Sequence, residues 1–168
     1  GSTVRRNPVQ HEYLRQVGRQ IHVTKLAGYL FFGTIVSVEA RIRSLIDEEA
    51  FNHRPIRYLV FDLAHVTGID YSAAEAFNRL NRIFSKKGVS IVMSGIKSES
   101  EIGSSLRAVG LGEGGNEVKL LPDLNAALES CENELLKALY QSKEARHHSQ
   151  HQRTGSGHAN YPQTSRDR

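Results

Sequence analysis

The residues with the clearest chemical potential lie at positions 66–75, where a strand pattern gives way to a helix pattern. Asp70 and Ser72 stand at this junction, with Tyr71 between them and Gly68 just before. Free amides and the positive end of the dipole favour an anion at a helix N-terminus. A phosphoryl group on Ser72 would be tolerated there and would present about −1.5 to −2 charges to a partner. The simpler alternative is that Ser72 only caps the helix.

Two further segments have features of anion or nucleotide sites. Gly33 and Thr34 follow a short apolar run and begin a helix pattern, so their amides could face an anion, although plain capping explains the same residues. Residues 110–115 fit the pattern G-x-G-x-x-G. A dinucleotide site needs these glycines after a strand and before a helix. Here they follow a helix pattern, which favours a helix end and a loop.

No set of residues predicts catalysis. Asp62 lies near the end of the predicted strand 57–63, but the acidic pair after the first strand and the lysine after the fifth that a phospho-accepting receiver domain needs are missing. His147, His148 and His151 stand in a polar segment without the organised geometry of a metal site. Cys131 falls on an apolar helix stripe, which is typical of a buried, inert thiol. We therefore expect no enzyme activity, no metal and no cofactor.

Strand and helix patterns alternate along the part of the chain that must position these residues. Strands are predicted at about residues 21–26, 29–32, 57–63, 89–94 and 118–121. Helices are predicted at about residues 34–49, 72–87, 101–109 and 123–139. The first two strands are separated only by Ala27 and Gly28, which favours an antiparallel hairpin. The predicted fold is α/β, with a mixed, mostly parallel five-stranded sheet that is led by a β-hairpin and flanked by about four helices.

Composition divides the 168 residues into three parts. Residues 1–19 are a polar lead-in, in which Gly1 and Ser2 have the look of a protease cleavage scar. Residues 20–140 contain the apolar patterns and are the expected domain. Residues 141–168 are rich in Ser, His, Gln and Arg and are expected to form a disordered tail or a linker.

Charge, cysteine content and hydropathy exclude several classes of protein. The net charge is +4, but residues 141–168 hold five basic and two acidic residues, so the expected domain is close to neutral. A neutral domain without a basic stripe is a poor candidate for nucleic-acid binding. The single cysteine excludes a disulfide framework. No apolar run reaches the roughly 18 to 20 residues that span a bilayer.

Five segments together resemble the STAS domain (sulphate transporter and anti-sigma factor antagonist). They are Glu-Tyr-Leu-Arg at 12–15, Leu-Ala-Gly-Tyr-Leu-Phe-Phe-Gly-Thr at 26–34, Tyr-Leu-Val-Phe-Asp-Leu at 58–63, Val-Thr-Gly-Ile-Asp-Tyr-Ser-Ala-Ala at 66–74 and Val-Lys-Leu-Leu-Pro-Asp-Leu at 118–124. The resemblance covers about residues 10–140. It is closest to the carboxy-terminal module of SulP-type anion transporters of fungal or similar origin.

The resemblance implies a non-catalytic, cytosolic regulatory domain that modulates transport, assembly or trafficking of a membrane transporter. The alternative is a free-standing antagonist that is switched by phosphorylation of Ser72. In that branch of the family a kinase modifies a serine in an Asp-Ser-Ser-Gly loop, and Ser72 matches its position. Ala73 replaces the glycine of that loop, as in the transporter branch.

The resemblance also implies the partners of the domain. These are the transmembrane domain of its own parent, a second copy of the chain and a further carboxy-terminal domain, with no nucleic acid. The expected location is the cytosolic face of a membrane. There, Arg5 and Arg6 near anionic head groups would contribute about 1 kcal/mol each.

Overall fold

The structure, a computed structural model, describes residues 1–112 and 117–155 of the chain. Over these residues four parallel strands form one sheet in the spatial order β1 (Ile21–Leu30), β2 (Tyr58–Ile69), β3 (Ser90–Ser94) and β4 (Lys119–Leu121). Consecutive strands are connected through α2 (Phe32–Arg43), α4 (Tyr71–Lys86) and α5 (Glu101–Ala108). The remaining elements are α1 (Pro8–Val17), η1 (Gly18–Gln20), η2 (Ser44–Ile46), α3 (Glu48–His53) and α6 (Leu124–Gly155).

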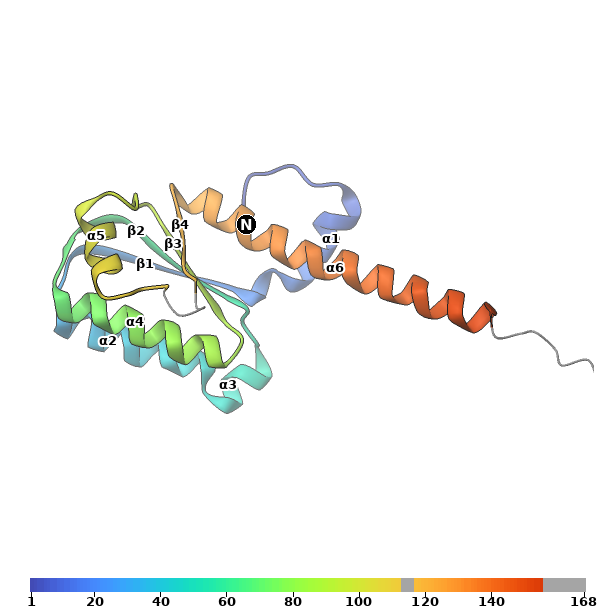
Figure 1. Cartoon of the computed structure of the whole chain (residues 1–168), viewed down its shortest axis with the longest axis horizontal. Coiled ribbons are helices and arrows are strands. Elements are labelled where there is room, and N and C mark those ends of the chain that lie inside the picture. The colour runs from blue at the N-terminus through green and yellow to red at the C-terminus, as the bar shows by residue number, and fades with distance from the viewer. Residues whose placement is uncertain (113–116, 156–168) are drawn as a thin grey trace, which may run out of the picture.

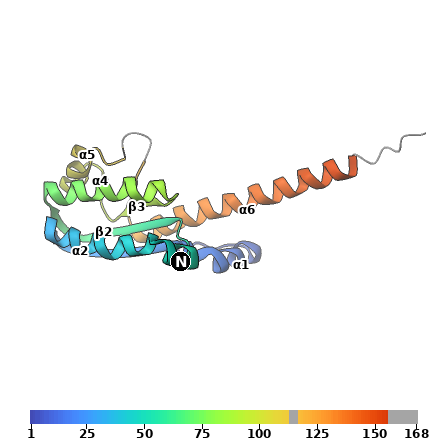
Figure 2. The ribbon, with the colours of Figure 1, turned by 90° about the horizontal axis from the view of Figure 1, so that it is seen from below.

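The helices cover the two faces of the sheet unequally, as Figures 1 and 2 show. Each crossover moves one strand along in the same direction, and right-handed crossovers of this kind place their helices on one face. On that face the side chains of Leu59 and Phe61 pack with α2, α4 and α5 in the larger core. On the other face Val60 packs against Cys131 of α6. The alternation along β2 thus puts one side chain into each core in turn.

The predicted α/β class is confirmed, but the predicted hairpin is wrong. Residues 21–30 form the single strand β1, which runs parallel to β2 along its whole length. Gly28 has a φ of 76° and lies at one of two register shifts in the pairing. Ala27 and Gly28 therefore belong to a continuous strand instead of a turn, and at both shifts the extra residue lies on β2. Because the second predicted strand is lost, the described sheet has four strands instead of five.

The apolar stripe that predicted the helix after β2 is confirmed in α4. Ala76, Phe77, Leu80 and Phe84 are all buried in the larger core. The Phe77 ring meets the ring of Phe61 on β2 edge to face, with 5.2 Å between the centroids. This helix is therefore fixed on the sheet, and its first turn has a fixed position at the carboxyl end of β2.

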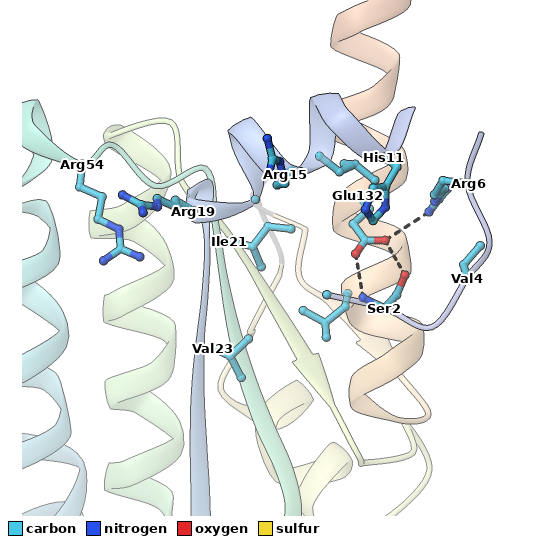
Figure 3. A pocket seen from close by; sticks show the side chains of 14 residues that line it. Ser2, Val4, Arg6, His11, Arg15, Arg19, Ile21, Val23, Arg54 and Glu132 are labelled. Atoms are coloured by element: carbon cyan, nitrogen blue, oxygen red, sulfur yellow. Dashed lines mark hydrogen bonds and ion pairs between the residues drawn. The ribbon is translucent and has the colours of Figure 1, made fainter. Parts of the chain in front are cut away.

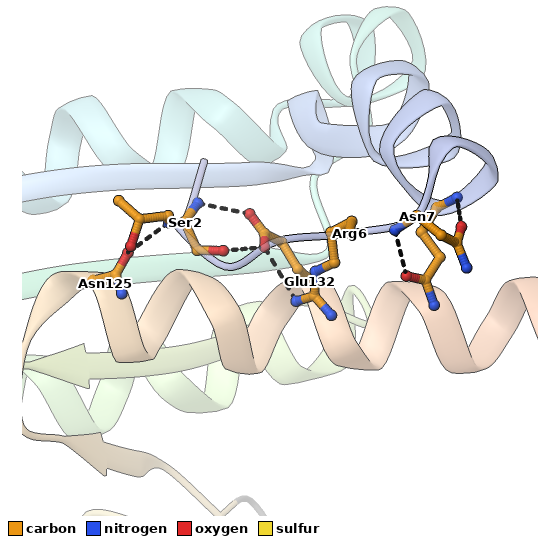
Figure 4. A network of polar contacts seen from close by, with 7 residues as sticks. Ser2, Arg6, Asn7, Asn125 and Glu132 are labelled. Carbon is orange, nitrogen blue, oxygen red and sulfur yellow. Dashed lines mark hydrogen bonds and ion pairs between the residues drawn. The ribbon is translucent and has the colours of Figure 1, made fainter.

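The N-terminal segment lies along α6 (Figure 4). The Thr3 amide donates to Asn125 Oδ1 at 2.8 Å, and Gln10 donates to the Tyr140 hydroxyl at 2.6 Å. Asn7 caps α1 in a reciprocal capping box with Gln10. The predicted lead-in thus contains a helix that docks on the last helix of the chain.

The last helix extends beyond the predicted domain boundary at residue 140. α6 continues as a helix to Gly155, through residues that were expected to belong to a disordered tail or a linker. The rest of that predicted tail, residues 156–168, lies outside the described residues, and so do residues 113–115 of the glycine-rich run. Among the described residues, no helix combines the length and the apolar character that a membrane span requires.

Cys131 is expected to be unreactive while the protein is folded. Its side chain is buried between α6 and the sheet, and this burial raises the pKa of the thiol to about 12. Since the thiolate is the nucleophile, almost none forms near pH 8. The folded protein should therefore react slowly with a disulfide reagent, and the same protein in urea should react at the rate of a free thiol. Fast, complete labelling without urea would contradict this burial.

Candidate docking site at the carboxyl ends of β1 and β2

Asp70 joins the N-termini of two helices. β2 continues to Ile69, so Asp70 alone separates the strand from α4. Its Oδ1 accepts a hydrogen bond from the Ala73 amide at 2.7 Å, and its Oδ2 accepts one from the Phe32 amide at 3.1 Å. Its own amide donates to the carbonyl of Leu30 at 3.1 Å. One carboxylate thereby serves the positive ends of both α2 and α4.

Asp70, and not Ser72, is the N-cap of α4, which corrects the sequence prediction. The helix begins at Tyr71, so Ser72 lies in its first turn. The predicted start was late because the strand was expected to end at residue 63, leaving a longer loop than exists. Ser72 and Tyr71 are both exposed, and Gly68 is half-buried. The roles predicted for these residues in partner contact and phosphorylation stay predictions.

Gly33 and Thr34 lie in the first turn of α2 and are exposed. The N-cap position of this helix is Phe31, which makes no side-chain capping bond. The carboxylate of Asp70 instead takes the Phe32 amide, so the chain supplies a negative charge of its own at this helix N-terminus. An external anion there would stand close to that charge. Anion binding at Gly33 and Thr34 stays a prediction.

Large apolar side chains gather around this junction on the surface. Five of the seven exposed large hydrophobic residues in the described chain lie at the end of β1, in or next to the start of α2, and at the start of α4. We call these five residues the aromatic patch: Tyr29, Phe31, Phe32, Val36 and Tyr71, with exposed fractions of 46%, 59%, 48%, 43% and 66%. The rings of Tyr29 and Phe31 stack at a tilt, 4.6 Å apart. Clustered exposed apolar groups of this kind mark interaction sites.

Sequence reasoning missed the aromatic patch because it predicted that residues 29–32 form the second strand of a hairpin. Only Leu30 of that run is buried, since β1 ends at Leu30 and α2 begins at Phe32. The available signal was the run of four apolar residues between two glycines. A chain that changes from strand to helix within this run cannot bury all four side chains.

A shallow, acidic hollow adjoins the aromatic patch. It has a volume of about 400 Å³ and lies between the ends of β1 and β2 and the start of α5. Tyr29 and Gly68 line one side, and Glu99 and Glu101 line the other. Close by, the Tyr71 hydroxyl bonds to Glu75, and this raises the pKa of the phenol. The patch therefore has carboxylates beside its rings.

Gly68 sets the position of the Tyr29 ring. A Cβ on Gly68 would lie 2.6 Å from Cε2 of Tyr29, which is closer than such atoms approach. Gly68→Ala should push this exposed ring aside, change the tyrosine signal in near-ultraviolet circular dichroism, and lower stability by less than about 1 kcal/mol. Gly18→Ala is the control, because nothing lies within 4 Å of its added Cβ. Identical spectra for the two variants would contradict the close contact.

The other sequence-predicted polar residues do not join this site. Asp62 is buried on β2, where it accepts hydrogen bonds from the Ser94 hydroxyl and the Ala64 amide. It therefore has a structural role between neighbouring strands. Residues 147–151 lie on the exposed end of α6, and no group of three metal-ligating side chains comes together anywhere in residues 1–112 and 117–155.

Comparison with known proteins identifies similar domains. A family model described as the STAS domain matches residues 15–116. A vacuolar basic amino acid transporter of Saccharomyces cerevisiae is 45% identical over 139 residues, which are 80% of this chain and 13% of that protein. The chain thus spans only a small part of this curated relative.

Two solved structures share the fold. A sulfate transporter family protein from Wolinella succinogenes has a TM-score of 0.55 at 18% identity, covering 70% of this chain and 88% of that one. The STAS domain of a SulP transporter from Vibrio cholerae has a TM-score of 0.54 at 23% identity, covering 78% of this chain and 99% of that one.

Proposed function

Since the chain belongs to the STAS domain family, we propose that it is a regulatory domain of a SulP-type membrane transporter and docks on its parent through the aromatic patch. The family resemblance found in the sequence is thereby confirmed. The proposal adds a surface and a partner to it. The single observation that carries it is the concentration of exposed aromatic side chains at the joined starts of α2 and α4.

The chemistry of the aromatic patch fits the cytosolic surface of a membrane protein. Aromatic side chains are enriched in the cores of protein interfaces, where they bury much area for few rotatable bonds. The carboxylates of Glu99 and Glu101 beside Tyr29 add a negative rim. Cytosolic loops of membrane proteins carry an excess of Lys and Arg. An acidic, aromatic surface is therefore complementary to such loops.

The similarity to a transporter over most of this chain supports the same proposal. The yeast relative is described as a vacuolar basic amino acid transporter, and this chain corresponds to 13% of its length. A transporter of that size leaves ample sequence for a membrane domain to which this domain would attach. A homodimer and a further carboxy-terminal domain remain predictions for the parent.

The proposal is tested first by removing the domain. Transport by a full-length parent is compared with transport by a parent that lacks residues 10–140, after both are shown to reach the membrane in equal amounts. We expect reduced transport or reduced delivery of the shortened protein. Unchanged delivery and unchanged transport would contradict a regulatory role.

The second test addresses the aromatic patch itself. Binding of this chain to the detergent-solubilised membrane domain of its parent is measured for the natural sequence and for Phe31→Ser with Phe32→Ser. We expect at least a tenfold loss of affinity, because both rings leave the proposed interface. Val9→Ser is the matched control, since Val9 is 58% exposed on α1, outside the aromatic patch. Equal affinities of all three proteins would contradict docking through the aromatic patch.

The exposure of Ser72 favours phosphorylation as a control of the same surface. A phosphoryl group in the first turn of α4 would benefit from the helix dipole and add charge next to Tyr71. If the docked loops are basic, Ser72→Asp should raise the affinity for the membrane domain severalfold at low salt, and this gain should vanish near 1 M salt. Ser37→Asp, on an exposed position of α2, is the control. If Ser72→Asp leaves the affinity unchanged at low salt, control of docking by phosphorylation of Ser72 is contradicted.

A further inference from the structure

A second hollow lies on the face of the sheet that α1 and α6 cover, where β1 begins, and it is separate from the aromatic patch. Its volume is about 500 Å³, which is within the size range of small-molecule sites. Its apolar lining includes Ile21 and Val23 of β1 (Figure 3). Leu14 of α1 and Leu128 of α6 add to this lining. No connecting helix crosses this part of β1, since α2, α4 and α5 all pack on the other face of the sheet.

Basic side chains surround this apolar lining. Arg6, Arg15, Arg19 and Arg54 all line the hollow, together with His11. The only carboxylate among its lining residues in the described chain is that of Glu132. We call this hollow the arginine groove. Its charge is opposite in sign to that of the hollow beside the aromatic patch.

Internal ion pairs neutralise little of this positive charge. Glu132 is buried, and its carboxylate already bonds to Arg6, at 3.4 Å, and to Ser2 (Figures 3 and 4). Arg15 pairs with Glu12 in a solvent-exposed contact at 3.2 Å, which is weak. Within residues 1–112 and 117–155, no carboxylate lies at ion-pair distance from Arg19 or Arg54.

The side chain of Arg6 provides a second observation, besides the unneutralised positive charge, that indicates a ligand with oxygen acceptors in the groove. Its side chain is only 12% exposed, and its Nε is a buried donor without a hydrogen-bond partner. Buried donors in folded proteins almost always have a partner, because leaving one unpaired is unfavourable. A ligand oxygen at this end of the groove would supply one.

We propose that the arginine groove binds an organic phosphate, with the phosphoryl group at the guanidinium groups of Arg19 and Arg54 and the apolar part on the lining of Ile21, Val23 and Leu14. Guanidinium groups bind phosphate oxygens through paired, parallel hydrogen bonds. A phosphate carries up to two negative charges, which matches the unneutralised charge of Arg19 and Arg54. This chemistry belongs to anionic phospholipids and to soluble phosphate esters. The proposal is independent of docking through the aromatic patch.

The direct test measures binding of phenyl phosphate and inorganic phosphate to this chain by calorimetry. The two probes share the phosphoryl group, and only the first has an apolar ring. We expect phenyl phosphate to bind about tenfold more tightly, since burial of even part of a ring favours binding. Binding of neither probe overturns the proposal. Equal affinities overturn the role of the apolar lining.

Variants then locate the site. Arg19→Gln with Arg54→Gln should weaken phenyl phosphate at least tenfold, and these exposed side chains can be changed without loss of the fold. Arg19→Lys should recover only part of the affinity of a single variant Arg19→Gln, because lysine lacks the planar fork. Arg82→Gln, on the exposed face of α4, is the control for charge. Affinity that survives the double variant, or that falls equally with Arg82→Gln, overturns the location.

Vesicles distinguish the two sources of the phosphate. Phosphatidylcholine vesicles with about a fifth phosphatidic acid are compared with pure phosphatidylcholine in co-sedimentation. Binding to the acidic vesicles that phenyl phosphate displaces assigns a lipid ligand, whereas phenyl phosphate binding without vesicle binding assigns a soluble ester. Because Gly1 and Ser2 line the groove and are predicted to be a cleavage scar, the measurements are repeated on a chain that begins at Thr3. Loss of all binding in that chain overturns the proposal.

Discussion

Replacing Asp70 with alanine is expected to lower the free energy of unfolding by about 2 kcal/mol, measured by urea denaturation. Loss of a good N-cap costs roughly 1 kcal/mol, and here that cap belongs to α4. The second part of the loss comes from the Phe32 amide, whose bond to Asp70 Oδ2 connects the start of α2 to the same carboxylate. The variant therefore loses the tie between two helices as well as a cap.

A matched variant separates these two contributions. Asp123 accepts a hydrogen bond from the Ala126 amide at 2.7 Å, at the start of α6, and within residues 1–112 and 117–155 its carboxylate bonds to no second helix. Asp123→Ala should therefore cost only about 1 kcal/mol. Equal losses for the two variants would show that the bond to Phe32 adds nothing. Asp70 binds the Phe32 amide and directly precedes Tyr71, and both of these residues belong to the aromatic patch. Asp70→Ala should therefore also weaken docking.

Phe77→Ala should have a larger effect on stability, a loss of about 3 to 5 kcal/mol. The Phe77 ring is fully buried, and it meets the Phe61 ring edge to face at 5.2 Å. Its removal leaves a cavity between α4 and the sheet that the closely packed neighbours can fill only in part. Urea denaturation should show a lower midpoint, and a loss below about 1 kcal/mol would contradict the tight packing of this core.

Phe32→Ala removes the same atoms from the surface and is the control for this prediction. Phe32 is 48% exposed in the aromatic patch, so its truncation should change stability by less than about 1 kcal/mol. The same variant should weaken binding to the membrane domain of the parent. The two phenylalanines thus separate folding from docking. Phe77→Ala should lower stability at a buried position that does not contact a partner, whereas Phe32→Ala should lower affinity with little effect on stability.

Helix α4 shows why much of this fold could be predicted from the sequence. The spacing of Ala76, Phe77, Leu80 and Phe84 matches one face of a helix, and all four side chains are buried. Such periodicity predicts which residues are buried, because only the residues on the inner face of a helix must be apolar. The continuous apolar run of β2 likewise predicted a strand that is covered on both faces. The alternation of these patterns was enough to predict an α/β fold.

The first strand shows where local signals misled. Ala27 and Gly28 resemble a turn, and only pairing with β2 shows that Gly28, with its φ of 76°, belongs to a continuous strand. A turn and a continuous strand are both compatible with the local sequence at these two residues. The parallel ladder, made with residues 58–69, selects the strand.

Residues that are close along the chain were enough to predict the alternation of strands and helices from β2 onward, the core-facing stripes and the family resemblance. The cap of α4, the aromatic patch and the arginine groove depend instead on tertiary contacts. Asp70 meets the Phe32 amide across 38 positions, and Arg6 meets Glu132 across 126. Contacts over such distances depend on how whole elements pack, and even the apolar run at residues 29–32 indicates only that some of its side chains stay exposed, not which ones.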